Sequence, residues 1–107
     1  MFIDRSKTAL VVIDLQKGIA GRQTAPYASE IVIKNAAALA AAFRKNSMSV
    51  FLVRVTPSPD GKDALRPVAD VVMPAQTLPP DWAEIVPEMG PKPNDFCLLY
   101  TSDAADE

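Results

Sequence analysis

Asp14 is the residue of this chain that is best placed to do chemistry, because its carboxylate directly follows the apolar run Ala-Leu-Val-Val-Ile at 9–13. The run lacks the alternation of a half-exposed strand and is typical of a parallel strand covered on both faces. In open α/β sheets, the carboxyl ends of such strands border the crevice in which ligands bind. Asp14 is therefore a candidate for proton transfer or ligand contact. The structural alternative is a carboxylate that accepts hydrogen bonds from backbone amides at the strand end.

The chain offers little thiol or imidazole chemistry. It contains no histidine, and its one cysteine, Cys97, opens the apolar run Cys-Leu-Leu-Tyr at 97–100, which predicts a strand. A reactive thiolate needs a cationic side chain or a helix N-terminus beside it, so we assign no catalytic role to Cys97. A single cysteine forms no disulfide framework and no thiolate metal site. We expect neither a metal nor a cofactor.

An amphipathic helix is predicted from Ser29 to Lys45. The Ser29 hydroxyl can cap the first free amides, and Glu30 follows where the helix dipole favours a negative charge. Asn46 is expected to end the helix in a left-handed conformation. Four apolar residues recur at steps of three and four and predict the face that packs on a sheet: Val32, Ala36, Leu39 and Phe43.

The run VFLVRV at 50–55 predicts a second strand, and strand, helix and strand form a βαβ unit with parallel strands. Nine of the ten prolines lie at 57–93, so this region is expected to be largely irregular. Within it, 81–86 predicts a short helix that buries Trp82 against its own domain. After a turn, a third strand is expected to begin at Phe96.

Four features together resemble the amino-terminal half of an isochorismatase-like cysteine hydrolase: KTALVVIDLQ at 7–16, the predicted helix, VFLVRV at 50–55 and the segment 88–96. The Asp-x-Gln ending of the first strand is the most specific of them. The resemblance implies an α/β fold, the amino-terminal part of a doubly wound, Rossmann-like parallel sheet that is three-layered in the full protein. It is closer to an uncharacterised hydrolase branch than to the nicotinamidase branch, which has an aspartate and two histidines after the second strand. No metal is implied.

The resemblance further implies an Asp-Lys-Cys triad acting on a small amide or vinyl ether. Asp14 matches the aspartate that takes the thiol proton and returns it to the leaving group. The lysine is expected a few residues into the third strand, so Lys92 is too early, and the cysteine is expected much later at a helix N-terminus. Two further residues are candidates for substrate binding. Gln16 matches the glutamine that helps to fix the loop and the site, although it can instead be a loop amide bonded to backbone. Ile19 matches a position that often lines the substrate pocket, although it can instead be a core residue. With one of three catalytic groups, the chain is expected to be inactive.

The segment CLLYTSDAADE at 97–107 resembles the translation of a sequencing-library adapter. We therefore expect a partial hydrolase domain at 1–96 and a non-native tail at 97–107, with a parent protein that is longer. The tail holds three of the thirteen acidic residues and none of the eleven basic ones, which leaves a net charge of +1 on the first 96 residues. This near-neutral charge balance does not indicate a basic surface for binding nucleic acid.

Other expectations concern partners and location. The apolar run at 9–13 is too short for a signal peptide or a membrane span. We expect a cytoplasmic protein with a small-molecule substrate, no nucleic-acid or membrane partner, and a homo-oligomeric full-length form.

Four alternatives compete with the hydrolase interpretation. Phosphatases of the haloacid dehalogenase type use Asp-x-Asp, whereas the second position here is Gln16. Receiver domains need a further acidic pair near the aspartate to hold magnesium, and none is evident near Asp14. Dinucleotide binding requires G-x-G-x-x-G after the strand, and 15–21 does not provide it. The chain can also be an inert structural piece of a longer protein.

Overall fold

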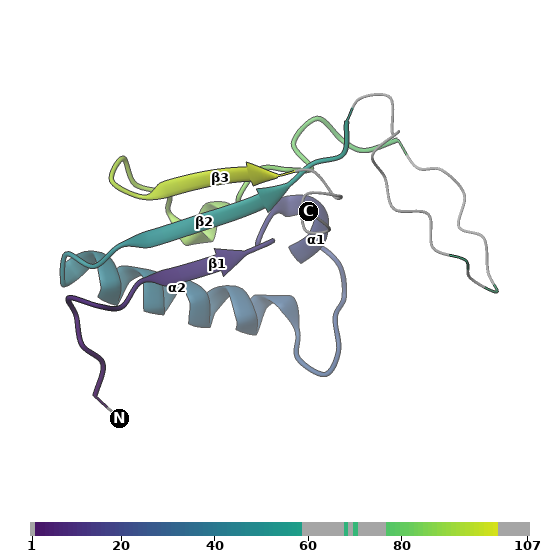
Figure 1. The fold of residues 1–107 in the computed structure, drawn as a ribbon. Coiled ribbons are helices and arrows are strands. Elements are labelled where there is room, and N and C mark those ends of the chain that lie inside the picture. The colour runs from purple at the N-terminus through teal and green to yellow at the C-terminus, as the bar shows by residue number, and fades with distance from the viewer. Residues whose placement is uncertain (1, 59–67, 69, 71–76, 101–107) are drawn as a thin grey trace.

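The structure is a computed structural model that describes residues 2–58, 68, 70 and 77–100. In chain order the elements are β1 (Leu10–Ile13), α1 (Lys17–Ala20), α2 (Ser29–Lys45), β2 (Val50–Val55), the 3-10 helix η1 (Pro87–Met89) and β3 (Phe96–Tyr100). The three strands form one parallel sheet in the order β1-β2-β3, with α2 as the crossover between β1 and β2 (Figure 1). The α/β class and the βαβ unit are thus confirmed.

The pairing of the strands brings their carboxyl ends to one edge of the sheet. Ile13 at the end of β1 pairs with Val53, and Val55 at the end of β2 pairs with Tyr100. Asp14 and Tyr100, which are far apart in the sequence, therefore lie at the same edge.

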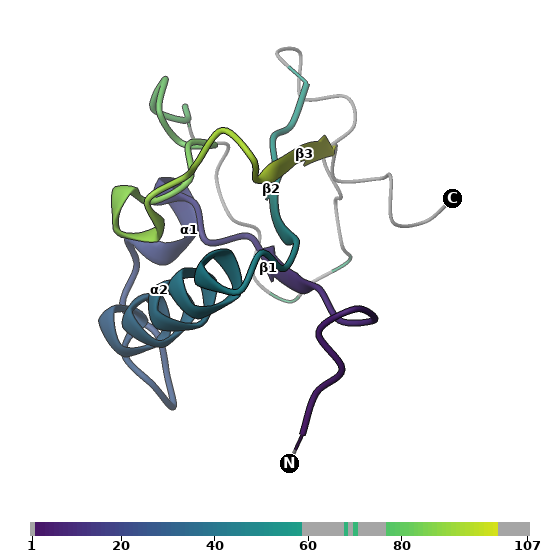
Figure 2. The ribbon, with the colours of Figure 1, turned by 90° about the vertical axis from the view of Figure 1, so that its left-hand side faces the viewer.

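Helix α2 and η1 cover one face of the sheet (Figure 2). The core on this face consists of seven buried apolar residues: Val12, Ala20, Ala40, Val50, Leu52, Val86 and Met89. On the other face, Val11, Ile13 and Leu98 are each more than half exposed. The prediction that β1 is covered on both faces is therefore wrong for the described residues, because their helices all lie on one side.

The predicted bounds of α2 are confirmed, but both of its ends differ in detail. No side chain caps the first turn, since the Ser29 hydroxyl donates to the Arg22 carbonyl at 2.8 Å and so ties the preceding loop to the helix. At the other end Asn46 has φ −96°, and Ser47 takes the left-handed conformation with φ 57°. The chain reverses one residue later than predicted.

The apolar face predicted for α2 is partly wrong. Val32 and Leu39 are 43% and 50% exposed, whereas Ala40 is fully buried against the sheet. Ala36 and Phe43 do pack on the core. The alanine-rich side of the helix turns inward because its small side chains let the helix approach the strands closely.

The segment 81–86 is not the helix that the sequence predicts. It runs antiparallel to the residues that follow β1, with an isolated bridge between Gln16 and Ile85. Pro87 directly follows the segment and disfavours a helical conformation at Val86, which is extended with ψ 136°. The third strand does begin at Phe96, as predicted. Much of the proline-rich region, at 59–67, 69 and 71–76, lies outside the described residues.

Candidate active site

Asp14 stands at the carboxyl end of β1 in a left-handed backbone conformation, with φ 64°. Its amide still donates to the Val53 carbonyl at 2.9 Å, which is the last hydrogen bond of the β1–β2 ladder. Its half-buried carboxylate accepts a hydrogen bond from the Tyr100 hydroxyl, at 3.1 Å to Oδ1 and 3.3 Å to Oδ2. Aspartate is among the few residues that enter this region of backbone space readily.

The left-handed conformation decides which way the carboxylate points. Regular alternation along β1 would place Asp14 on the face of Val12, which α2 covers. Tyr100 lies two residues after Leu98 in β3 and so belongs to the opposite face. The positive φ therefore turns the Asp14 carboxylate away from the helix and over the end of β2, where the long tyrosine side chain meets it.

The contact also affects the phenol. Burial raises the pKa of the Tyr100 hydroxyl above its ordinary value, and the hydrogen bond to the Asp14 carboxylate raises it further. The physical cause of the second effect is that an ionised phenol would face a negative charge.

A cavity of about 310 Å³ opens beside Asp14. Its walls come from α1, from the loop that follows it and from the start of α2, and include Ile19, Tyr27 and Val32. Ile19 and Asp14 thus line the same mainly apolar pocket. The volume is at the lower end of the range for pockets that hold small molecules.

Gln16 does not line this cavity, because it is completely buried and bonded to backbone. Its Oε1 accepts a hydrogen bond from the Val55 amide at 2.8 Å, and its Nε2 donates to the Val55 carbonyl at 2.8 Å. A longer contact of 3.4 Å joins Nε2 to the carbonyl of Trp82. The geometry agrees with the loop-amide alternative and gives Gln16 no contact with the pocket.

The segment 82–86 docks on the residues after Asp14 through main-chain hydrogen bonds. The Lys17 amide donates to the Glu84 carbonyl at 2.8 Å, and the Gly18 amide to the Trp82 carbonyl at 2.9 Å. The half-buried Trp82 ring packs so tightly on Gly18 that a Cβ atom there would overlap it. Trp82 thus lies against its own chain.

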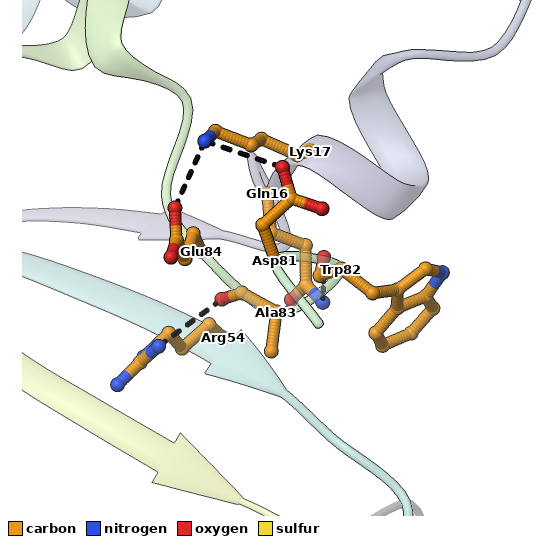
Figure 3. Close-up of polar contacts among 7 residues, drawn as sticks. All are labelled: Gln16, Lys17, Arg54, Asp81, Trp82, Ala83 and Glu84. Atoms are coloured by element: carbon orange, nitrogen blue, oxygen red, sulfur yellow. Dashed lines mark hydrogen bonds and ion pairs between the residues drawn. The ribbon is translucent and has the colours of Figure 1, made fainter. Parts of the chain in front are cut away.

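Ionic contacts at the surface reinforce this docking (Figure 3). Lys17 Nζ lies 2.8 Å from Glu84 and 3.4 Å from Asp81, and these hydrogen bonds and charges, that of Glu84 first, raise the pKa of the lysine. Arg54 of β2 donates to the Ala83 carbonyl at 3.3 Å. Sequence reasoning gave Lys17, Arg54 and Tyr100 no role. Arg54 and Tyr100 could have been found as candidates from their positions near the carboxyl ends of β2 and β3.

Neither Cys97 nor Lys92 is placed to serve Asp14. Cys97 lies on β3, where it pairs with Leu52 of β2. Because β2 separates β3 from β1, Cys97 is two strand spacings, about 10 Å, from β1. Lys92 lies in the turn before β3, at the opposite edge of the sheet. In the described part of the chain, no group of three or more histidine, cysteine or acidic residues is arranged to bind a metal. None of the helices described is long and apolar enough to cross a bilayer.

The site lies within a domain that known proteins share. The profile of the isochorismatase domain matches residues 8–102, which span β1 to β3 and include Asp14, Gln16 and Ile19. The chain belongs to the isochorismatase family. The match continues into 97–102, and the non-native origin of the tail stays a prediction.

Two curated members of the isochorismatase family and one solved structure resemble the chain. The uncharacterized protein YecD of Escherichia coli O157:H7 is 40% identical over 97 residues, which cover 91% of this chain and 52% of that protein. The uncharacterized protein YwoC of Bacillus subtilis (strain 168) is 45% identical over 100 residues, which cover 90% of this chain and 49% of that protein. The structure of an isochorismatase family protein from Burkholderia thailandensis matches with TM-score 0.73 and 36% identity, over 85% of this chain and 48% of that one. The chain thus spans about half the length of these relatives.

Proposed function

We propose that the complete protein to which this chain belongs hydrolyses small amides through an Asp-Lys-Cys triad in which Asp14 moves the proton. Vinyl ethers are the less favoured substrates. The observation that carries the proposal is the place of Asp14, whose carboxylate stands at the end of β1 beside a cavity of about 310 Å³ in a chain of this family. A carboxylate at that edge can reach both a bound molecule and a group on a neighbouring strand.

In the proposed reaction, the carboxylate of Asp14 accepts the proton of a cysteine thiol. The thiolate attacks the amide carbon, and the carboxylic acid of Asp14 then gives its proton to the departing nitrogen. Water hydrolyses the thioester that remains. The cavity fits this scheme because its mainly apolar walls can enclose a small substrate and because Asp14 is the one acidic residue among those that line it.

The position of Tyr100 supports a specific place for the missing lysine. Its hydroxyl crosses the end of β2 and reaches Asp14 at 3.1 Å. We propose that the triad lysine meets Asp14 from this same place at the end of β3, four residues after Phe96. The 107-residue chain presents a phenol there in place of an ammonium group, and Cys97 is too far from Asp14 to act as nucleophile, so the chain itself is proposed to be inactive.

A thiol-blocking experiment tests the proposed function. The complete protein should release ammonia from one of a panel of small primary amides, and alkylation of its thiols with iodoacetamide should stop the release. The 107-residue chain is the matched negative control. Release that survives alkylation would contradict a cysteine mechanism. Transfer of a phosphoryl group to Asp14 from acetyl phosphate and magnesium would instead favour a receiver-type domain.

A further inference from the structure

The β1–β2 ladder changes its chemistry directly after Asp14. In a regular parallel ladder, every second residue of β2 bonds through both its amide and its carbonyl to the main chain of β1. Val53 keeps this pattern, because its carbonyl accepts from the Asp14 amide at 2.9 Å. Two residues later, the amide and the carbonyl of Val55 both bond at 2.8 Å to the side-chain amide of Gln16. The glutamine side chain thus stands in for a peptide group of β1.

This substitution makes room for the unusual conformation of Asp14. The main chain at Gln16 stands away from β2 by the length of a glutamine side chain, so β1 leaves the ladder between Val53 and Val55. Asp14 is the residue at which it leaves, with φ 64°, and the same turn directs its carboxylate to Tyr100. The left-handed residue is held between two fixed points, its own amide on Val53 and the side chain of Gln16 on Val55.

Gln16 is itself held firmly. It is fully buried, and its Nε2 also approaches the carbonyl of Trp82 at 3.4 Å, within the segment that docks on the loop (Figure 3). It adds no formal charge and does not line the cavity, and its hydrogen bonds go to the backbone of Val55 and Trp82 rather than to the carboxylate of Asp14. Any influence on catalysis therefore passes through the backbone.

We propose that Gln16 is a positioning residue, whose amide clamps Val55 and so fixes the left-handed conformation that aims the Asp14 carboxylate at the end of β3. The catalytic consequence rests on the proposed function, whereas the positioning itself does not. A purely stabilising role would predict that replacing Gln16 lowers the melting temperature and leaves Asp14 in place.

The titration of Tyr100 distinguishes these two roles in the 107-residue chain. Tyr27→Phe leaves Tyr100 as the one tyrosine, and tyrosinate absorbance then reports its pKa, which Asp14 raises. Asp14→Asn measures the share that Asp14 contributes. Gln16→Met, which keeps length but removes the amide, should lower the pKa of Tyr100 by most of that share, and adding Asp14→Asn should then change little.

A matched control separates positioning from stability. Asp95→Asn removes the negative charge that Arg44 binds at the other end of β3, so it should lower the melting temperature and leave the Tyr100 titration unchanged. A Gln16→Met chain that titrates like its parent would overturn the proposal. If that variant does not fold, Gln16→Asn, which stays neutral but is one methylene too short to keep both hydrogen bonds to Val55, should lower the pKa of Tyr100 in the same way. Nuclear Overhauser contacts between the Tyr100 ring and the Asp14 β-protons give the same readout at neutral pH.

Kinetics of the complete protein supply the catalytic consequence. Gln16→Met should lower kcat by about 100-fold, the scale of a small misplacement of a reacting group, with little change in KM. A rise in KM alone would contradict a role through Asp14. The tyrosine titration needs no turnover, so a complete protein without amidase activity would refute the proposed hydrolase and leave the positioning test standing.

Discussion

Two buried polar clamps hold the segment between 81 and 95 to the rest of the fold, and they use opposite chemistry. At the amino end of β3, Arg44 of α2 binds Asp95 through two hydrogen bonds of 2.7 and 3.1 Å and also donates to the Met89 carbonyl at 3.0 Å. At the carboxyl end of the sheet, Gln16 uses a neutral amide to bind backbone groups. The Asp95 side chain is only 3% exposed, and Gln16 is fully buried.

The difference follows from what lies nearby. A charged clamp at position 16 would act electrostatically on Asp14, two residues away, and so would disturb the proton transfer that we propose for Asp14. The neutral side-chain amide of Gln16 holds the chain in place without adding a charge beside Asp14. At the far end, the charged pair has only structure to maintain, and the forked geometry of arginine fixes the direction of the helix relative to the strand.

The largest loss of stability is expected from breaking the charged clamp. Asp95→Ala would leave Arg44 partly buried without its carboxylate, and removing one partner of a buried pair typically lowers the free energy of unfolding by about 3 to 5 kcal/mol. Urea denaturation measures the effect. A loss below about 1 kcal/mol would place this pair among ordinary surface ion pairs and remove the contrast with Gln16.

An intermediate loss is expected where the docked segment meets the loop after Asp14. In Gly18→Ala the new methyl group would overlap the Trp82 ring, and overpacking of this kind costs about 1 to 3 kcal/mol. Trp82→Ala should relieve the overlap, so the double variant should lose less than the sum of the two single variants. Additive losses in a double-mutant cycle would show that the ring does not pack on Gly18 in solution.

Acid should weaken the charged clamp and not the neutral one. Burial alone would raise the pKa of Asp95, but Arg44 and the Lys92 amide outweigh it and hold the pKa below its ordinary value. The pair therefore stabilises the fold fully above the unfolded-state pKa of about 3.9, and this contribution is lost as the pH falls through the folded-state pKa. Urea midpoints measured from pH 6 downward should fall less in Asp95→Asn than in the parent. If the urea midpoints of Asp95→Asn and of the parent fell equally with pH, the Asp95 carboxylate would not be the source of the acid sensitivity.

The smallest effect is expected at the surface contacts of Lys17. The lysine side chain is 39% exposed, and its partners Asp81 and Glu84 are more than half exposed, so solvent screens both pairs. Lys17→Met should shift the urea midpoint less than Gly18→Ala, and the shift should vanish in high salt. A shift as large as that of Gly18→Ala, retained in salt, would mean that Lys17 belongs with the buried clamps.

Local sequence pattern predicted the three strands and the long helix α2, but it missed the short helices α1 and η1 and wrongly predicted a helix at 81–86. The apolar run before Asp14 and the run at 50–55 became β1 and β2, and the helix occupies the predicted Ser29–Lys45. These elements depend on residues that are close in sequence, as does the candidate site residue at the strand end. A pattern of this kind states which residues belong to a helix or a strand.

Contacts between segments that are far apart in the sequence could not be predicted from local sequence pattern. The partner of Gln16 lies 39 residues away on β2, and its bonding is visible only once β1 and β2 are in register. The same holds for Gly18 and Trp82, whose fit depends on how 82–86 docks. Ser29 had two competing partners, the helix amides and the Arg22 carbonyl, and the loop geometry decided between them.

The most direct test is Asp14→Asn in the complete protein, because the carboxylate of Asp14 is the group proposed to move the proton. The substitution keeps the size of the side chain and removes its basicity, so kcat/KM for the best amide substrate should fall by about 10² to 10⁴, the usual contribution of general acid–base catalysis, while the melting temperature is retained. Turnover within a few-fold of the parent, at an unchanged melting temperature, would show that Asp14 is structural and would contradict the account.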